Sequence, residues 1–246
     1  MIRKRFFYSL WFCLALLPGL AWAQCTATWD IEELAGKKGS TMTLRFEGKD
    51  VATLPVIWVR SLVEVKRRVD QASGIQTQMF LCGDSEPNAF ATIVDQRNVV
   101  AITLGMTGLL GEDWDAYAAV LGHESAHITL GHHRQTQVRE TVIGLAQMFG
   151  SMALETFIRG SGGSAGMGDN LSSIGASLVS SAYSRGAERE ADRQGIRYAI
   201  RAGYDPQGAV RLHQKLNARG SFMSTHPGSA QRVAELQKII AELQRQ

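Results

Sequence analysis

Cysteine and proline are rare in this chain of 246 residues, and neither sign of charge dominates it. With 45% hydrophobic and 20% charged residues, its composition is that of a globular protein and excludes disorder, collagen and coiled coil. The formal charge of +3 includes three basic residues at positions 3–5, without which 23 basic residues face 23 acidic ones. Because this remainder is neutral, charge gives no reason to expect a nucleic-acid partner.

The only long apolar run follows those three basic residues, at positions 6–20. It is shorter than the roughly 20 residues of a membrane-spanning helix. Ala21-Trp22-Ala23 after it forms a small-x-small cleavage site. This order predicts a signal peptide over residues 1–23, cleaved after Ala23, and an exported mature chain. A retained membrane anchor and a lipid-modified Cys25 are less favoured alternatives, the second because the preceding glutamine fits lipoprotein processing poorly.

Export changes the meaning of the few cysteines, because Cys13 would leave with the signal peptide. In an oxidising compartment the remaining pair, Cys25 and Cys82, favours one disulfide that ties the mature N-terminus to the body. The alternative is a pair of unpaired thiols, with Cys82 buried in a strand.

The hydrophobic pattern predicts an α+β chain that is mainly helical, without internal repeats, and a single domain over residues 24–246. Helical spacing covers residues 55–71, with Pro55 suited to the first turn. Three short β-prone runs predict a small, largely antiparallel sheet at residues 76–82, 89–94 and 99–104. Five glycines between Gly160 and Gly168 form either a plain loop or a mobile lid. The other expected elements are a strand at 41–46 and helices at about 113–133, 135–158, 171–184, 187–201, from 206, and 229–244.

The sequence His123-Glu124-Ser125-Ala126-His127 lies within the helix expected at 113–133. Residues four apart share a helix face, so His123 and His127 can bind one divalent metal. Glu124 lies about 100° round the helix, within reach of a water at the metal but poorly directed as a ligand. The motif predicts a zinc site at which Glu124 takes a proton from the water that attacks a carbonyl carbon. The alternative, two structural histidines, is disfavoured because burying two polar rings without partners is costly.

A catalytic zinc needs a third protein ligand, and two carboxylates share a helix face further along the chain. We expect Glu188 to complete the site of one Zn²⁺ per chain and Asp192 to orient a metal-bound histidine. The alternative for this stretch is a solvated run of charges that includes Arg185 and Arg189.

These motifs resemble peptidase family M48, a family of zinc metallopeptidases. The resemblance rests on Val120-Leu121-Gly122 before H-E-x-x-H and on Ser184-Arg185-x-x-Glu188-x-x-Ala191-Asp192. Asn88-Ala89-Phe90-Ala91 and Ser224-Thr225-His226-Pro227, followed by Arg232, agree with it. It spans roughly residues 55–235 and implies a helical gluzincin-type fold with a small sheet whose edge strand holds extended substrate.

The resemblance also implies roles for residues outside the metal motifs. His226 matches a family histidine that approaches the metal, where it would assist catalysis or gate the site; the alternative is an ordinary turn histidine. Asn88 and Ala89 would offer backbone groups to a bound peptide, and the alternative is an ordinary edge strand. The other histidines, His132, His133 and His213, are expected to play no part in the site.

For short bacterial members the resemblance implies quality control in the periplasm. The favoured hypothesis is an endopeptidase that cleaves unfolded or misassembled cell-envelope proteins, with peripheral contact to the outer membrane or its assembly machinery left open. A periplasmic chaperone or assembly factor that uses the cleft mainly for binding is the alternative. A hydrolase of cell-wall amides is less favoured, because the sequence has no recognisable carbohydrate-binding aromatic cluster.

Overall fold

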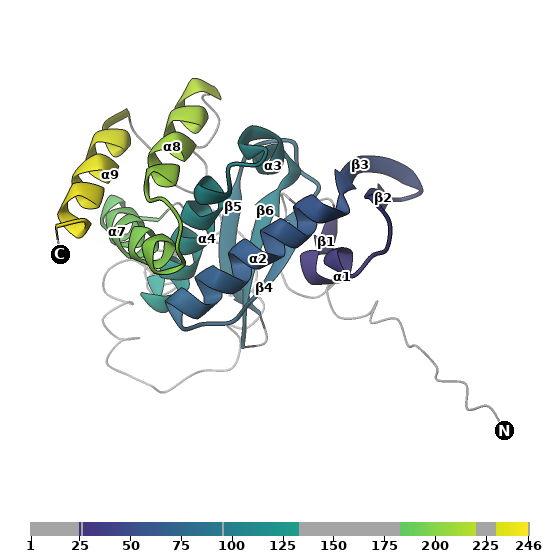
Figure 1. Cartoon of the computed structure of the whole chain (residues 1–246), viewed down its shortest axis with the longest axis horizontal. Helices are drawn as coiled ribbons and strands as arrows, with labels where there is room; N and C mark the ends of the chain where they lie inside the picture. Colours follow the sequence, from purple (N-terminus) through teal and green to yellow (C-terminus); the bar gives the residue numbers. More distant parts are fainter. Residues whose placement is uncertain (1–24, 26, 95, 133–182, 220–229, 246) are drawn as a thin grey trace, which may run out of the picture.

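The computed structural model describes residues 25, 27–94, 96–132, 183–219 and 230–245 (Figure 1). Several sequence predictions lie outside these residues: the signal peptide, the helix at 135–158, nearly all of that at 171–184, the Gly160–Gly168 segment, His133 and His226. Those predictions remain predictions.

A four-stranded sheet forms one side of the core, with the strand order β1-β4-β6-β5. Its strands are β1 (Thr28–Asp30), β4 (Thr77–Cys82), β6 (Arg97–Thr103) and β5 (Ala89–Val94). β1 and β5 pair antiparallel with their neighbours, but β4 and β6 are parallel, from Thr77 opposite Asn98 to Cys82 opposite Thr103. The α+β class is confirmed, whereas the sheet is mixed rather than largely antiparallel. The reason is that the chain passes from β4 to the far edge, and β6 returns into the space between β4 and β5.

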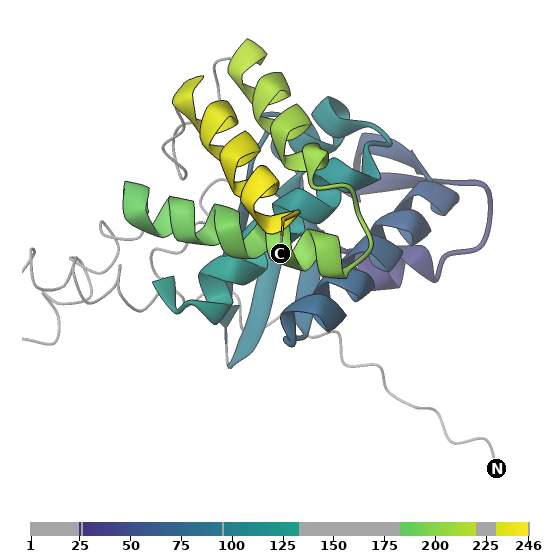
Figure 2. The same cartoon turned by 60° about the vertical axis from the view of Figure 1, so that its left-hand side comes forward.

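The described part of the chain contains seven helices. They are α1 (Ile31–Ala35), α2 (Val56–Ser73), α3 (Leu104–Leu110), α4 (Trp114–Thr129), α7 (Arg185–Arg201), α8 (Gln207–Arg219) and α9 (Ala230–Leu243). α4 is the central one, because it contacts β5, α2, α7 and α8. Eleven of its 16 residues are buried, so α4 is covered nearly all round rather than along one stripe. Figure 2 shows α8 and α9 side by side above α7.

The first strand predicted, at residues 41–46, is β2 (Thr41–Phe46), and it pairs with a strand that the sequence pattern did not reveal, β3 (Lys49–Pro55). This hairpin lies at the end of the molecule opposite α7, α8 and α9 (Figure 1). Pro55 is the N-cap of α2 rather than part of its first turn. None of the described helices combines the length and the apolar character that crossing a bilayer requires.

The helix that carries both histidines of the motif ends earlier than expected. Its last helical residue is Thr129, and Gly131 adopts a left-handed φ of 69°. Glycine tolerates this conformation because it has no Cβ. After this turn, His132 contacts His127, with their Nδ1 atoms 3.0 Å apart.

Cys25 and Cys82 form a disulfide, with their Cα atoms 5.3 Å apart, as the favoured pairing predicts. The bond holds the start of the described chain against the end of β4. Because it links residues 57 positions apart, it restricts the unfolded chain considerably.

Replacing both cysteines by alanine is expected to lower the free energy of unfolding by about 2–4 kcal/mol. Urea denaturation of the oxidised wild type and of the double variant measures this loss. Reduced wild type is the control and should unfold at the midpoint of the variant; equal midpoints for oxidised wild type and variant would contradict the expectation.

Candidate metal centre

The metal-binding candidates come from two helices, α4 and α7, which cross in unusually close contact. A methyl group added to Gly122 would lie 2.5 Å from the carbonyl oxygen of Gly195. One added to Gly195 would lie 2.6 Å from the backbone nitrogen of His123. No side chain fits between the two backbones, so the glycines permit an approach that carries the carboxylates of α7 to the histidines of α4.

This crossing places the three predicted ligands around one point. The Nε2 atoms of His123 and His127 are 3.0 Å apart. Of the Glu188 carboxylate, Oε2 lies 3.5 Å from His123 Nε2, and Oε1 lies 3.3 Å from His127 Nε2. Ligands bound tetrahedrally at 2.0–2.1 Å are separated by about 3.3 Å. Two imidazole nitrogens and a carboxylate at these separations therefore fit a zinc ion.

Asp192 and Arg232 hold the first of these ligands in place. Asp192 Oδ1 lies 3.0 Å from His123 Nδ1, and Arg232 from α9 donates to both Asp192 oxygens at 2.9 and 2.7 Å. Arg232 Nη1 also lies 2.9 Å from Glu188 Oε2. Burial opposes the charge on Asp192, but the His123 hydrogen bond and the Arg232 charge keep its pKa well below the usual range. An ionised Asp192 accepts the proton on His123 Nδ1, which leaves the Nε2 lone pair for a metal.

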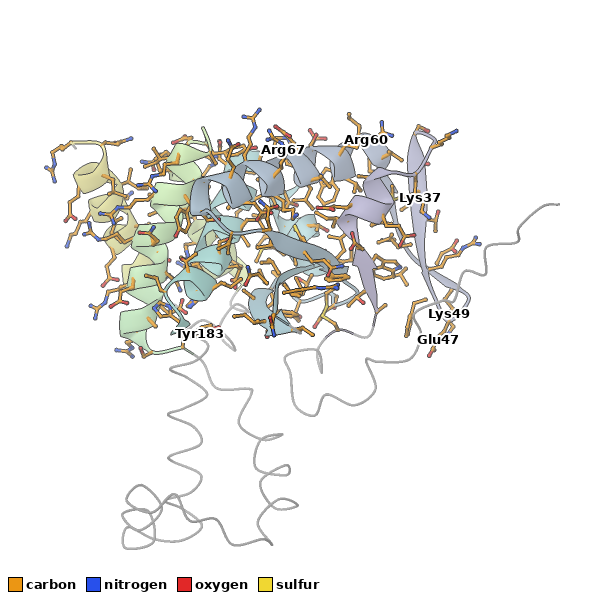
Figure 3. The ribbon with its side chains drawn as sticks, turned by 90° about the horizontal axis from the view of Figure 1, so that it is seen from below. Lys37, Glu47, Lys49, Arg60, Arg67 and Tyr183 are labelled. Atoms are coloured by element: carbon orange, nitrogen blue, oxygen red, sulfur yellow. A yellow bond between two sulfur atoms is a disulfide. The ribbon has the colours of Figure 1, made fainter. Side chains whose placement is uncertain are left out.

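The second histidine, His127, is completely buried. The Tyr183 ring, at the N-terminal end of α7 (Figure 3), stacks on its ring at a centroid distance of 3.8 Å. Burial, followed by the charges of Glu124 and Glu188, raises the pKa of the Tyr183 phenol, which keeps it neutral. On the Nδ1 side, His132 Nδ1 lies 3.0 Å from His127 Nδ1. His127 is thus fixed on two sides by residues that the sequence prediction did not include.

Glu124 is buried next to the histidines and lines a small cavity beside them. The other walls are mainly apolar side chains of α4, α8 and α9, with Ala89 at the start of β5. His213 of α8, which was expected to play no part in the site, also lines this cavity. Burial and the nearby Arg232 charge lower the pKa of His213 to about 3, which keeps its imidazole uncharged at neutral pH.

Asn88 and Ala89, the predicted peptide-binding pair at the start of β5, face opposite sides of this strand. Asn88 N–H donates to Thr103 Oγ1, and the Asn88 carbonyl accepts from Thr103 N–H at 3.0 Å. The backbone of Asn88 therefore faces β6 rather than the outer edge of the sheet. The Ala89 N–H donates to the side-chain oxygen of Asn88 at 2.9 Å. Since hydrogen-bonding direction alternates along a strand, the outward-facing backbone groups of β5 are those of Ala89, Ala91 and Ile93.

A comparison with family models decides the family. The model described as "Peptidase family M48" matches residues 58–240, which include every described residue of the metal centre. The chain belongs to peptidase family M48. The expected resemblance is thereby confirmed, and the family supports a metal-dependent hydrolase of peptide bonds.

Three similar proteins are named as proteases or as a metalloendopeptidase. The chain is 28% identical over 166 residues to the β-barrel assembly-enhancing protease of Yersinia pestis, covering 65% of this chain and 33% of that protein. It is 25% identical over 209 residues to the mitochondrial metalloendopeptidase OMA1 of Arabidopsis thaliana, covering 81% of this chain and 40% of that protein. It is 28% identical over 242 residues to a protease HtpX homolog of Salinibacter ruber, covering 83% of each. The chain thus spans less than half the length of the first two relatives.

The roles of two glycines, a histidine and a tyrosine in this M48 centre escaped the sequence prediction. Gly122 and Gly195 interrupt predicted helices at a cost of about 1 kcal/mol each, a signal that a packing reason exists. For His132, the preceding Gly131 was a signal that the helix could end before it. Nothing in the sequence around Tyr183 indicates that it stacks on His127.

The helix crossing gives a direct expectation for Gly195→Ala. Because the added methyl group meets backbone, which cannot rotate away, α4 and α7 must separate. We expect the free energy of unfolding to fall by about 1–3 kcal/mol. We also expect metal affinity to fall by about tenfold or more, because the donors on the two helices move apart. Chemical denaturation and metal competition titration measure the two effects.

The matched control is Gly108→Ala in α3, where an added methyl group meets nothing within 4 Å. It should leave metal affinity unchanged and stability equal or slightly higher, because alanine favours a helix. If Gly195→Ala behaves like this control, the close crossing does not position the ligands.

Proposed function

We propose that this M48 chain is a zinc endopeptidase of the periplasm that cleaves unfolded or misassembled envelope proteins. The observation that carries the proposal is the convergence of three donors, His123, His127 and Glu188, beside the buried carboxylate of Glu124. The basic and apolar order of residues 1–23 supports export. The relative named as a β-barrel assembly-enhancing protease supports a link to outer-membrane assembly.

A bound zinc ion would polarise the scissile carbonyl and lower the pKa of the attacking water. The side chains of the chain carry the remaining chemistry. Glu124 accepts the proton of the water as its oxygen bonds to the carbonyl carbon, and then delivers a proton to the amine as the carbon–nitrogen bond breaks. Asp192 keeps His123 in the orientation that the reaction requires.

Selectivity for unfolded protein follows from the edge strand of the described sheet. β5 begins at the cavity wall with Ala89 and presents the outward backbone groups of Ala91 and Ile93. An extended peptide can add to such an edge as a further strand, whereas a folded protein has its backbone already paired. Ile93 has 41% of its surface exposed, which gives an apolar contact for such a peptide.

Digestion of one protein in two states tests this selectivity. A disulfide-bonded substrate protein is prepared in its native form and in a reduced, carboxymethylated form. Each form is incubated with the purified mature chain, with and without a chelator. We expect cleavage of the unfolded form only, abolished by chelation and restored by zinc. Equal cleavage of both forms, or cleavage that resists the chelator, would contradict the proposal.

The chaperone alternative makes a different prediction for cells that lack the gene. If the function of the chain in the cell requires peptide cleavage, the Glu124→Gln variant, supplied to these cells at normal expression, does not restore envelope integrity. Full restoration by this variant would favour binding over cleavage. Fractionation of the same cells places the mature chain in the periplasm or the membrane.

A further inference from the structure

We propose that His132 is a positioning residue that sets the tautomer of His127 and thereby prepares it to bind the metal. The inference rests on the zinc site of the proposed function. Its basis is a buried contact between two imidazoles: His132 is 2% exposed, and its Nδ1 atom lies 3.0 Å from His127 Nδ1. The two rings meet edge to face, with centroids 5.0 Å apart at 69°.

The proton positions follow from the direction in which His127 faces. Its Nε2 atom points to the shared centre with His123 and Glu188, so this nitrogen must carry a lone pair if it is to bind a cation. A neutral His127 then carries its proton on Nδ1 and donates it to His132 Nδ1. His132 in turn carries its own proton on Nε2. One hydrogen bond thus selects the tautomer of each ring.

The second proton also has an acceptor. His132 Nε2 lies 3.4 Å from Oε2 of Glu190, a residue of α7 whose carboxylate is largely exposed. The contacts therefore run from Glu190 through His132 to His127. They match the arrangement on the other side of the centre, where Arg232 holds Asp192 and Asp192 holds His123. Each metal-facing histidine has its Nδ1 side held by a partner from outside its own turn of helix.

The turn at the end of α4 makes the contact possible. In a continuous helix, a residue five positions after His127 would be rotated by about 140° from it and would point elsewhere. The chain turns at Gly131, with its left-handed φ, and His132 contacts His127. Tyr183 covers another face of the His127 ring, so rotation of this ring is restricted from both sides.

Two variants of nearly equal size separate a polar role from a packing role. In His132→Asn, the side-chain amide replaces the Nδ1 acceptor, whereas His132→Leu fills the space without an acceptor. We expect His132→Leu to bind zinc about 10–100-fold more weakly than wild type. His132→Asn should stay within about threefold of wild type. Competition with a chromophoric chelator measures zinc affinity, and thermal unfolding of the metal-free proteins measures packing.

The tautomers of the metal-free wild type provide a test that needs no variant to fold. Nitrogen-15 chemical shifts should show His127 protonated on Nδ1 and His132 on Nε2. His127 protonated on Nε2 in the metal-free wild type would overturn the inference, as would zinc affinity of His132→Leu within threefold of wild type. Equal losses in the two variants would also overturn it.

Failure of this inference is distinguishable from failure of the proposed function. Wild type that binds zinc and cleaves peptides, with unchanged affinity in His132→Leu, contradicts the positioning role alone. Wild type that binds zinc through the expected tautomers without cleaving any peptide contradicts the endopeptidase alone.

Discussion

Glu124→Gln is expected to lower kcat for cleavage of an unfolded protein by about 10²–10⁴-fold, because the amide cannot accept the proton of the attacking water. The exchange preserves size and removes only the basic oxygen, and Glu124 is not among the three donors that surround the metal position. Zinc content and the unfolding midpoint should therefore remain close to those of wild type. Initial rates on an unfolded fluorogenic substrate, with metal analysis of the same samples, measure both.

The matched control for this variant is Glu112→Gln, at the exposed turn just before α4. It makes the same chemical change 12 positions away and should leave kcat unchanged. If Glu124→Gln retains wild-type activity with its zinc bound, another group is the general base. Loss of zinc together with activity would instead assign Glu124 to metal binding.

Arg232→Leu is expected to cause the largest loss of stability in the metal-free protein, about 3–5 kcal/mol. Arg232 is buried between two buried carboxylates, Asp192 and Glu188. Removing it leaves their charges without the cation that compensates them, and the desolvation cost remains. Urea denaturation in the presence of a chelator measures the loss without interference from bound metal.

An exposed ion pair between the same two helices is the control. Arg193 on α7 pairs with Glu242 on α9, and the two side chains are 39% and 44% exposed. Arg193→Leu should cost no more than about 1 kcal/mol, because water already screens the pair. Similar losses for Arg193→Leu and Arg232→Leu would show that the buried network contributes no special stability.

The metal centre was largely predictable because its residues lie in local patterns. The spacing of His123 and His127 on one helix is fixed by helical geometry, whatever the rest of the fold. Glu188 and Asp192 form a second local pattern of the same kind. The sequence could not show that the two helices meet through Gly122 and Gly195, although the resemblance to M48 made their proximity an expectation.

Features that depend on which segments pair in the folded chain were harder to predict from the sequence. The β-prone runs at 76–82 and 99–104 correspond to β4 and β6, but a hydrophobic pattern does not record which strand lies next to which. The same limit applies to Asn88, whose backbone direction depends on the pairing of β5 with β6. His132 was set aside because a continuous helix would carry it away from the metal, and the turn at Gly131 removes that objection.

The central claim is that His123, His127 and Glu188 hold one zinc ion between α4 and α7. Elemental analysis of the purified mature chain, beside Glu188→Ala prepared in the same way, tests it most directly. The account predicts about one zinc per wild-type chain and almost none in the variant, with the variant still folded by circular dichroism. A wild type without zinc, or a variant that retains it fully, would contradict the account.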